Sequence, residues 1–393
     1  MKALIFILLF PAALAAQRNP SADVAVQNTF NVMSYGAKGN GIADDTQAFQ
    51  NAFDAANAAN GKVIIPSPAQ FYRLTNTINV VPVTGNQVWI HVEAWGRAGS
   101  IRYHGVSNKP VFRIIGLKGA VWTGVNVAIG NGLTNVQCFD IDTTPEAEST
   151  SFVTFKDCYL DLGNQPNNDG FRLGHNSGGG ADISNYQWEN CTVFGTRKSG
   201  QIAYHIEGSN TLSQTWMGGF VAFCDRAYSN KSGTGAKDGR GNGSVYFFGM
   251  GCSQNNIDYD INFEQTYLIS GGRYEAGGSF LETGVGSYHA AITVENLQIN
   301  DYKSDHLFDI NTAATLVISN CRMNKQSSSF TDLVRVSAQS GAGSVIIDGG
   351  GTRAVNIINK EKGRWKAYTR GLGKFSDANG VFIGSYYPDL NGQ

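Results

Sequence analysis

A repeated pattern of short strands runs through most of this chain and limits what it can fold into. Residues 153–160 have apolar side chains at the first and third positions and a bend residue at the fifth. Most copies place Asn or Gly at that bend, and these residues tolerate the positive φ of a tight turn. Further copies of the pattern lie at residues 186–193, 215–222, 246–253, 267–274, 292–299, 316–323 and 345–352.

A second kind of strand alternates apolar and polar residues between these copies. It occurs at residues 138–142, 170–174, 203–207, 258–262, 307–311 and 333–337. Equivalent positions 139 and 334 are separated by seven repeats and 195 residues, a mean of about 28 residues. A repeat of this size with three short strands and no helix fits one coil of a parallel β-solenoid. The leucine-rich-repeat signature is absent, so we predict an all-β, right-handed parallel β-helix.

The six cysteines are interpreted from the same repeat. No C-x-x-C pair is present, which argues against a zinc site, and we predict no metal and no cofactor. Cys158 and Cys191 occupy the position after the bend, which points inward. In neighbouring coils they would lie about 4.8 Å apart. We favour stacked buried thiols, with a disulfide as the alternative that this spacing also allows.

Composition and the N-terminus limit the partners. The chain has 30 basic and 31 acidic residues, so it lacks the basic excess of a nucleic-acid-binding surface. Met1 and Lys2 precede an apolar stretch and small residues, which predicts a signal peptide over residues 1–16, cut after Ala15 or Ala16. The alternative is an uncleaved N-terminal anchor. No other apolar stretch approaches membrane-spanning length. We therefore expect a secreted or periplasmic protein that is not attached to a membrane after cleavage.

Residues 30–46 carry a Gly- and Asp-rich motif that precedes an amphipathic helix, about Thr46 to Ala59. Asp45 or Thr46 would be its N-cap, and Phe49 and Phe53 lie on its apolar stripe. We expect this helix to cover the open end of the solenoid. The motif resembles that of the pectate-lyase-like superfamily, which includes polygalacturonase-type glycoside hydrolases and phage tailspike depolymerases. Only Asn40 departs from it, and Tyr35, Asp44 and Asp45 are interpreted as structural.

The resemblance covers about residues 30–355 and implies a parallel β-helix whose alternating strands and loops form a glycan groove. The polygalacturonase signatures (N-T-D, a paired D-D, G-H-G and R-I-K) are absent, so the resemblance does not specify pectin hydrolysis. We divide the chain into an N-terminal extension at 17–29, the β-helix at 30–358 and a C-terminal cap at 359–393. Loops at 163–169, 176–185 and 229–243 would form the walls of the groove.

Outward side chains of the alternating strands should form columns along the solenoid. One column is predicted to run Asp140, Arg172, His205, Ser229, Asp260, Leu281, Asp309, Arg335, and the other to begin with Asp142, Gly174, Glu207. The backbones of Asp142 and Glu207 would lie two coils apart, about 9.6 Å. Their side chains could then reach the roughly 6.5–9.5 Å separation typical of inverting glycosidases.

These columns predict a catalytic site. In the hydrolase hypothesis Glu207 is the general acid, Asp142 is the base that activates water, and Asp169 is a reserve carboxylate. Arg172, His205 and Asp140 would bind the sugar; in a lyase, Arg172 and His205 would neutralise a uronate and take its C5 proton.

A second predicted surface carries aromatic side chains. Trp216 is expected to point outward there in line with Gln187, Phe247 and Leu268, and so to bind sugar rings. The alternative is that a loop or a partner subunit covers this surface.

Three functions remain open from the sequence. The first is an exported polysaccharide-degrading enzyme, a glycoside hydrolase acting within a glycan chain. The second is a polysaccharide lyase or C5-epimerase on uronic-acid polymers, and the third is a non-catalytic glycan-binding or tailspike-like protein. In each case the partner is a polysaccharide. We expect a monomer, with a homotrimer as the alternative.

Overall fold

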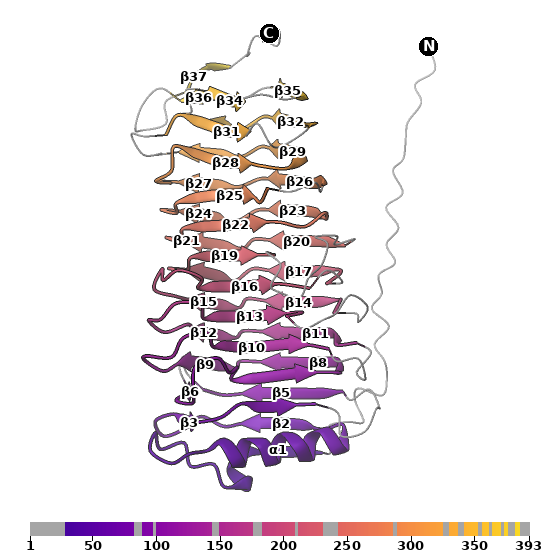
Figure 1. Ribbon diagram of the computed structural model, residues 1–393, viewed down its shortest axis with the longest axis vertical. Helices are drawn as coiled ribbons and strands as arrows, with labels where there is room; N and C mark the ends of the chain where they lie inside the picture. The colour runs from indigo at the N-terminus through magenta and orange to yellow at the C-terminus, as the bar shows by residue number, and fades with distance from the viewer. Residues whose placement is uncertain are drawn as a thin grey trace, which may run out of the picture.

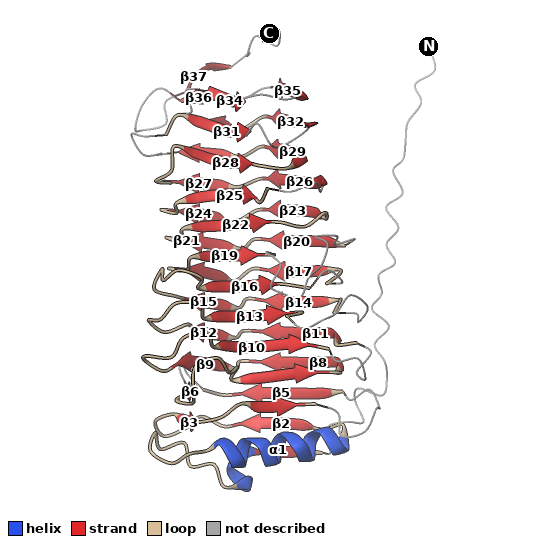
Figure 2. Cartoon of the chain, viewed as in Figure 1, coloured by secondary structure: helices blue, strands red, loops and turns tan. Residues whose placement is uncertain are grey.

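The computed structural model describes most of residues 28–385. The segments not described are 1–27, 82–88, 97–99, 144–148, 176–182, 209–210, 231–242, 286–288, 325–329, 337–341, 353–355, 361–363, 371–372, 376–381 and 386–393. The predicted signal peptide therefore lies outside the described residues. The chain winds into a long solenoid with three strand-built sides (Figure 1), and strands account for nearly all of its regular structure (Figure 2).

Three sheets run along the solenoid, and successive strands of each sheet pair in parallel with one exception. The strands of the first sheet are β1 (Thr29–Asn31), β2 (Lys62–Ile65), β5 (Ile90–Ala94), β8 (Lys118–Thr123), β11 (Ser151–Lys156), β14 (Tyr186–Glu189), β17 (Gln214–Met217), β20 (Ser244–Phe248), β23 (Thr266–Ser270), β26 (His289–Glu295), β29 (Ala313–Ser319), β32 (Ala342–Asp348) and β35 (Arg364–Arg370).

The second sheet follows the first in each coil. Its strands are β3 (Tyr72–Leu74), β6 (Ile101–Tyr103), β9 (Asn126–Ile129), β12 (Tyr159–Asp161), β15 (Thr192–Phe194), β18 (Phe220–Ala222), β21 (Gly251–Ser253), β24 (Arg273–Glu275), β27 (Gln298–Asn300), β30 (Arg322–Asn324), β33 (Gly351–Thr352), β36 (Gly373–Phe375) and β37 (Phe382–Ser385). The exception to parallel pairing is the last pair, β36 with β37.

The third sheet completes each coil and contains the predicted alternating strands. Its strands are β4 (Ile78–Val80), β7 (Phe112–Ile115), β10 (Gln137–Asp142), β13 (Asp169–Leu173), β16 (Ile202–Ile206), β19 (Arg226–Ser229), β22 (Ile257–Ile261), β25 (Ser279–Thr283), β28 (His306–Ile310), β31 (Asp332–Val336) and β34 (Asn356–Lys360). The predicted all-β parallel solenoid is confirmed. Pairing continues through β35, beyond residue 358, where the sequence pattern placed the end of the coils.

The bends between the first and second sheets have the predicted chemistry. Asp157 and Asn190 adopt positive φ values of 51° each. The Asn190 side-chain amide donates to the Asp157 carboxylate at 2.8 Å, so neighbouring bends are linked. In two coils the predicted frame is wrong by one residue. The bend residues are Gly218 and Gly249, both with φ of 66°, because adjacent glycines and a following apolar residue left the frame ambiguous.

Asn190→Ala is expected to lower the free energy of unfolding by about 1–2 kcal/mol, because Ala at positive φ is strained and the bond to Asp157 is lost. Equilibrium denaturation measures this change. Asn190→Gly is the matched control: it loses the same bond but relieves the strain, so it should cost less. Equal costs for the two variants would show that backbone strain is unimportant at this bend.

Aromatic side chains fill the core in continuous stacks. Trp188 and Trp216 stack with ring centroids 4.3 Å apart, and Phe247 continues the stack 4.4 Å from Trp216. These three residues are each only 1% exposed. All six cysteines are free and buried, as favoured from the sequence. The thiols of Cys158 and Cys191 donate to the carbonyl oxygens of the preceding coil.

The single α-helix of the described residues, α1 (Thr46–Ala59), lies at the N-terminal end of the solenoid (Figure 1). Its bounds are those predicted, and Phe53 packs on Phe112 and Trp122 of the core. Asp45 is the N-cap residue by position, but its buried carboxylate accepts the N–H groups of Lys38 and Gly39 instead of capping the helix. The carboxylate thus holds the Gly-rich loop, which supports the structural interpretation of the motif.

None of the helices in the described part of the chain is long and apolar enough to cross a membrane.

Candidate functional site

The third sheet presents its polar side chains in three outward columns. From β10 to β31, each strand has two adjacent buried residues after its first residue, such as Cys138 and Phe139. The strand register then defines a central column, which runs Asp140, Arg172, His205, Ser229, Asp260, Glu282, Asp309, Arg335. The prediction is correct except for Leu281. That residue is fully buried between Tyr259 and Phe308, and Glu282 takes its place in the column.

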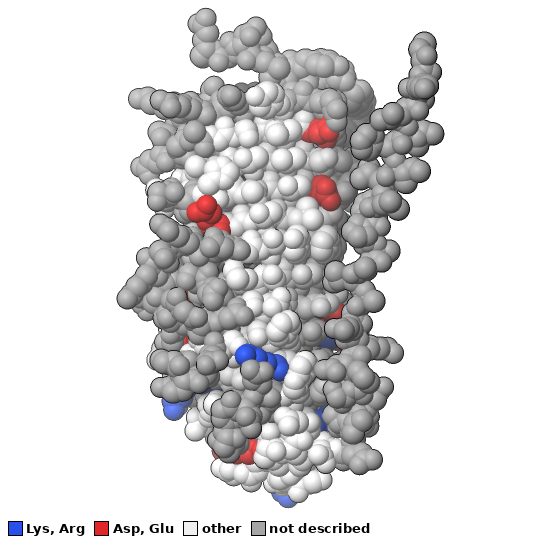
Figure 3. Space-filling view, turned by 90° about the vertical axis from the view of Figure 1, so that its right-hand side faces the viewer, with Lys and Arg blue, Asp and Glu red and all other residues white. Residues whose placement is uncertain are grey.

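Six ionisable side chains from three successive coils gather near the start of this face. We call Asp140, Asp169, Arg172, His175, His205 and Glu207 the N-terminal cluster. Asp140, Asp169, Arg172 and His205 come from β10, β13 and β16, Glu207 directly follows β16, and His175 is the second residue after β13. The face seen in Figure 3 carries few Lys, Arg, Asp and Glu side chains over most of its length, in contrast to the N-terminal cluster.

Every charged member of the cluster has a partner of opposite charge. Arg172 donates from Nε to Asp140 at 2.8 Å, and His175 Nδ1 lies 2.7 Å from Glu207. His205 lies between two carboxylates, 3.3 Å from Asp169 and 3.5 Å from Glu207. Three of the predicted site residues, Asp169, His205 and Glu207, are therefore in one network.

These groups are buried although they lie on the outer side of a sheet. The side chains of Asp140, Asp169 and Glu207 are only 4–6% exposed. Removing charged groups from water costs several kcal/mol each unless partners compensate. Burying these carboxylates therefore costs free energy of folding, and such an arrangement is typical of functional sites.

The electrostatics of Glu207 favour a base over the general acid predicted from the sequence. Burial opposes its ionisation, but the hydrogen bond to His175 and the charges of His205 and Arg172 outweigh burial and lower its pKa. Glu207 is therefore a carboxylate at neutral pH and suits a base, which has to accept a proton. Its two imidazole neighbours have raised pKa values. The hydrogen bond to Glu207 is the main cause for His175. Burial lowers the pKa of His205, but Asp169 and Glu207 together outweigh it.

Asp142 lies at the end of β10, in the column that continues through Gly174 to Glu207. It is 1% exposed, and its carboxylate accepts the Thr143 N–H at 2.9 Å. The predicted order of these three residues across successive coils is therefore present. Of the predicted wall loops, residues 163–169 are described and bond to neighbouring coils, as in the Asn167 N–H to the Ser199 carbonyl. Much of the loops at 176–185 and 229–243 lies outside the described residues.

The prediction that Trp216 binds sugar is wrong. Trp216 pairs in register with Trp188, not with Gln187, and both indoles are in the core. A shift of one residue along a strand moves every side chain to the opposite face, and the ambiguous glycine bend caused that shift. Phe247 is buried for the same reason. The aromatic side chains exposed near this bend are Phe220 and Phe248, which are 36% and 41% exposed.

His175 was missed from the sequence. It follows Gly174 directly after β13, so it lies outside the period-two pattern used to build the columns. The available signal was its position, directly after the predicted strand at residues 170–174. Its hydrogen bond to Glu207 is one of the contacts that lower the pKa of that residue.

No protein-family model and no curated protein matches the chain. Solved structures do match. The surface adhesin PfbA of Streptococcus pneumoniae is 13% identical, with 88% of this chain and 94% of the adhesin covered and a TM-score of 0.51.

The tailspike protein of E. coli bacteriophage HK620, solved in complex with a pentasaccharide, is 11% identical, with 91% of this chain and 67% of the tailspike covered and a TM-score of 0.53. A mutant of the same tailspike with the pentasaccharide gives a TM-score of 0.55 at 11% identity, with 92% and 69% covered. The resemblance found in the N-terminal motif is thus confirmed at the level of the fold: the chain is a right-handed parallel β-helix protein.

Proposed function

We propose that this protein is an exported glycan-acting enzyme, a glycoside hydrolase that cleaves within a polysaccharide chain at the N-terminal cluster. The observation that carries the proposal is a paired network on an outward sheet face, in which the buried carboxylates Glu207 and Asp169 contact two histidines and lie beside Arg172. A solvated solenoid face does not need such a network. The tailspike that shares this fold was solved with a bound pentasaccharide, which adds support for a glycan as the ligand.

The roles of the paired carboxylates follow from the charge of Glu207. We assign Glu207 to the activation of water, because its lowered pKa keeps it ionised. Proton donation to the leaving sugar then belongs to Asp142, the reverse of the roles predicted from sequence. Their backbones are two coils apart, about 9.6 Å, which leaves room for the water of an inverting mechanism. Arg172, His205 and Asp140 would bind the sugar, with Asp169 orienting His205.

The test begins with a panel of neutral and acidic polysaccharides, read for new reducing ends and for ultraviolet absorbance. Reducing ends without absorbance support the hydrolase. Once the sugar is known, aryl glycosides with good and poor leaving groups separate the two roles, because a good leaving group needs no proton. Asp142→Asn should remain active on the good leaving group, and Glu207→Gln should lose activity on both. The opposite pattern would reverse the assignment.

A lyase or C5-epimerase is the second candidate, and one observation favours it. Arg172, His175 and His205 place cationic groups beside an ionised carboxylate, as binding a uronate and removing its C5 proton would require. Cleavage with ultraviolet-absorbing, unsaturated ends would identify the lyase. Exchange of the C5 hydrogen with solvent, without cleavage, would identify the epimerase.

The proposal also covers the oligomeric state of the protein and the role of α1 at the N-terminal end of the solenoid. We expect an exported monomer in which α1 covers the N-terminal end of the core through Phe49 and Phe53. The exposed Phe220 and Phe248 are the surface that a homotrimeric, non-catalytic spike would bury. Light scattering of the mature protein distinguishes a monomer from a trimer, and a trimer inactive on the whole panel would favour the spike.

A further inference from the structure

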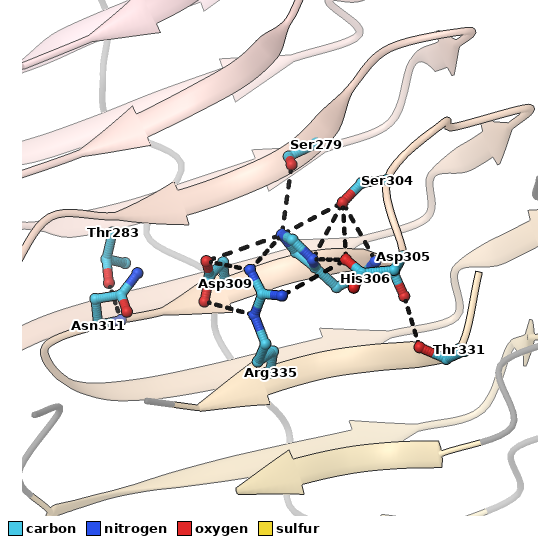
Figure 4. Close-up of polar contacts among 9 residues, drawn as sticks. All are labelled: Ser279, Thr283, Ser304, Asp305, His306, Asp309, Asn311, Thr331 and Arg335. Carbon is cyan, nitrogen blue, oxygen red and sulfur yellow. Dashed lines mark hydrogen bonds and ion pairs between the residues drawn. The ribbon is translucent and has the colours of Figure 1, made fainter. Parts of the chain in front are cut away.

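A second polar group lies on the third sheet, toward its C-terminal end. It contains Ser279 at the start of β25, His306 at the start of β28 and Asp305 directly before it (Figure 4). Ser279 Oγ is 3.5 Å from Nε2 of His306, and Nδ1 of His306 is 2.5 Å from Asp305 Oδ1. A hydroxyl, an imidazole and a carboxylate in this order are the parts of an activated serine nucleophile.

We propose that Ser279, His306 and Asp305 form the triad of an acyl hydrolase that removes O-acyl groups, such as acetyl esters, from a glycan. Ser279 is the nucleophile, His306 is the general base, and Asp305 orients the imidazole. Ester hydrolysis is a reaction that such a triad catalyses. That the ester is carried by a glycan rests on the proposed function.

The surroundings of His306 fix the tautomer that a base requires. Arg335 Nη2 lies 3.4 Å from His306 Nε2. A guanidinium only donates hydrogen bonds, so this contact favours a ring with its proton on Nδ1. That proton then points at Asp305. Nε2 carries the lone pair that a base for the hydroxyl needs, and Arg335 and Ser279 both approach it, at 3.4 Å and 3.5 Å.

The orienting carboxylate is itself held in place. The backbone carbonyl of Asp305 accepts the N–H groups of Thr331 and Asp332 from the next coil, at 2.9 Å each. Arg335 contacts the Asp305 carboxylate at 3.5 Å and binds Asp309 through two of its nitrogens. The Asp305 side chain is 51% exposed and that of Arg335 is 34% exposed, so the carboxylate end of the triad faces solvent, whereas Ser279 and His306 are 6% and 5% exposed.

The charges around Ser279 suit an acyl transfer. The Arg335 guanidinium and the Ser279 hydroxyl both lie within 3.5 Å of His306 Nε2. The guanidinium can therefore donate a hydrogen bond to an oxyanion that forms beside Ser279. Glu282, in the central column of the same strand, would repel such an oxyanion if it were ionised. Burial raises the pKa of Glu282, and the nearby Asp309 adds to this, although a hydrogen bond with Ser279 lowers it; the raised pKa weakens this repulsion.

The reaction balances with water as the only co-reactant. Ser279 Oγ attacks the ester carbonyl carbon while His306 Nε2 takes the hydroxyl proton. The tetrahedral intermediate collapses, the bond to the sugar oxygen breaks, and Nε2–H returns the proton to that oxygen. Water, deprotonated by Nε2, then attacks the acyl–Ser279 ester and releases the carboxylic acid with free Ser279.

The experiment uses the full chain with p-nitrophenyl acetate and with an O-acetylated polysaccharide, following acetate release. Ser279→Ala should lower ester hydrolysis by roughly a thousandfold or more. Asp305→Asn should lower kcat while leaving KM nearly unchanged. Thr283→Val is the matched control, because it removes another hydroxyl of β25, one that accepts a hydrogen bond from the Asn311 N–H, and it should keep full activity. Phenylmethylsulfonyl fluoride should transfer its phenylmethylsulfonyl group to the Ser279 hydroxyl alone, with release of fluoride, which mass spectrometry of the peptides measures.

Folded wild-type protein that hydrolyses neither ester, or a Ser279→Ala variant as active as wild type, would overturn the proposal. Activity on p-nitrophenyl acetate but on no acetylated glycan would overturn the substrate class. Glycan cleavage measured in the same samples separates the two proposals. Ester hydrolysis that depends on Ser279, without chain cleavage, means that only the hydrolase proposal at Glu207 fails, and chain cleavage without ester hydrolysis means that only the triad fails.

Discussion

Glu207→Gln is expected to lower kcat on the polysaccharide substrate by about 10²–10⁴-fold while leaving the fold intact. The amide keeps the shape of the carboxyl group but cannot accept the proton of the attacking water. The pH profile carries a second signature. Because its neighbours lower the pKa of Glu207 below the usual 4.5, the acidic limb of kcat/KM should lie below that pH. Reducing-end assays across pH measure both effects.

Glu189→Gln is the matched control for this substitution. Glu189 also lies on the outer side of a sheet and also has a cationic partner, Lys156 at 3.4 Å, but it belongs to the first sheet. We expect it to retain full activity. A Glu207→Gln protein as active as Glu189→Gln would remove Glu207 from the mechanism.

The free energy of unfolding is expected to fall as the pH rises from about 4 to about 7, because of a carboxyl group inside the core. Asp258 is 1% exposed, and Tyr302 and Asn255 donate hydrogen bonds to it. Burial raises the pKa of Asp258 from 3.8 to about 7. Below pH 4 the group is protonated in both states. Between the two pKa values the unfolded chain loses its proton first, which favours unfolding.

The expected loss is on the order of 4 kcal/mol, complete a little above pH 7. Denaturation curves at several pH values measure it. His175 and His205 also have raised pKa values and add a loss in the same direction as they deprotonate. Asp258→Asn isolates the core group, because an amide has no charge to bury, and should flatten the curve by that amount. Parallel curves for wild type and variant would contradict the account.

Much of the fold could be predicted because each coil repeats the same physical problem. Apolar residues at period two, with Asn or Gly where the chain needs positive φ, predict three strands and their bends. The N-terminal helix was predicted to the residue from its apolar stripe. The ladders then brought Asp140, Arg172 and His205 into one column, because parallel strands in register stack equivalent positions.

The errors arose where that pattern is locally ambiguous. Two glycines in succession, Gly218 and Gly219, left the bend position uncertain by one residue and moved Trp216 to the wrong face. Phe280 and Leu281 are adjacent and both buried, so strict alternation of buried and outward residues did not place Glu282 in the central column. His175 and Asp305 lie outside the alternating strands, so no periodicity indicates that they contact Glu207 and His306. Protonation states depend on such contacts and follow only from three-dimensional structure.

A crystal structure of Glu207→Gln with an oligosaccharide of the identified substrate tests the central claim most directly. The account predicts a sugar ring against Arg172 and His205 on the third sheet, with the scissile bond between Asp142 and residue 207. Sugar bound only at another surface, such as the exposed Phe220 and Phe248, would contradict it.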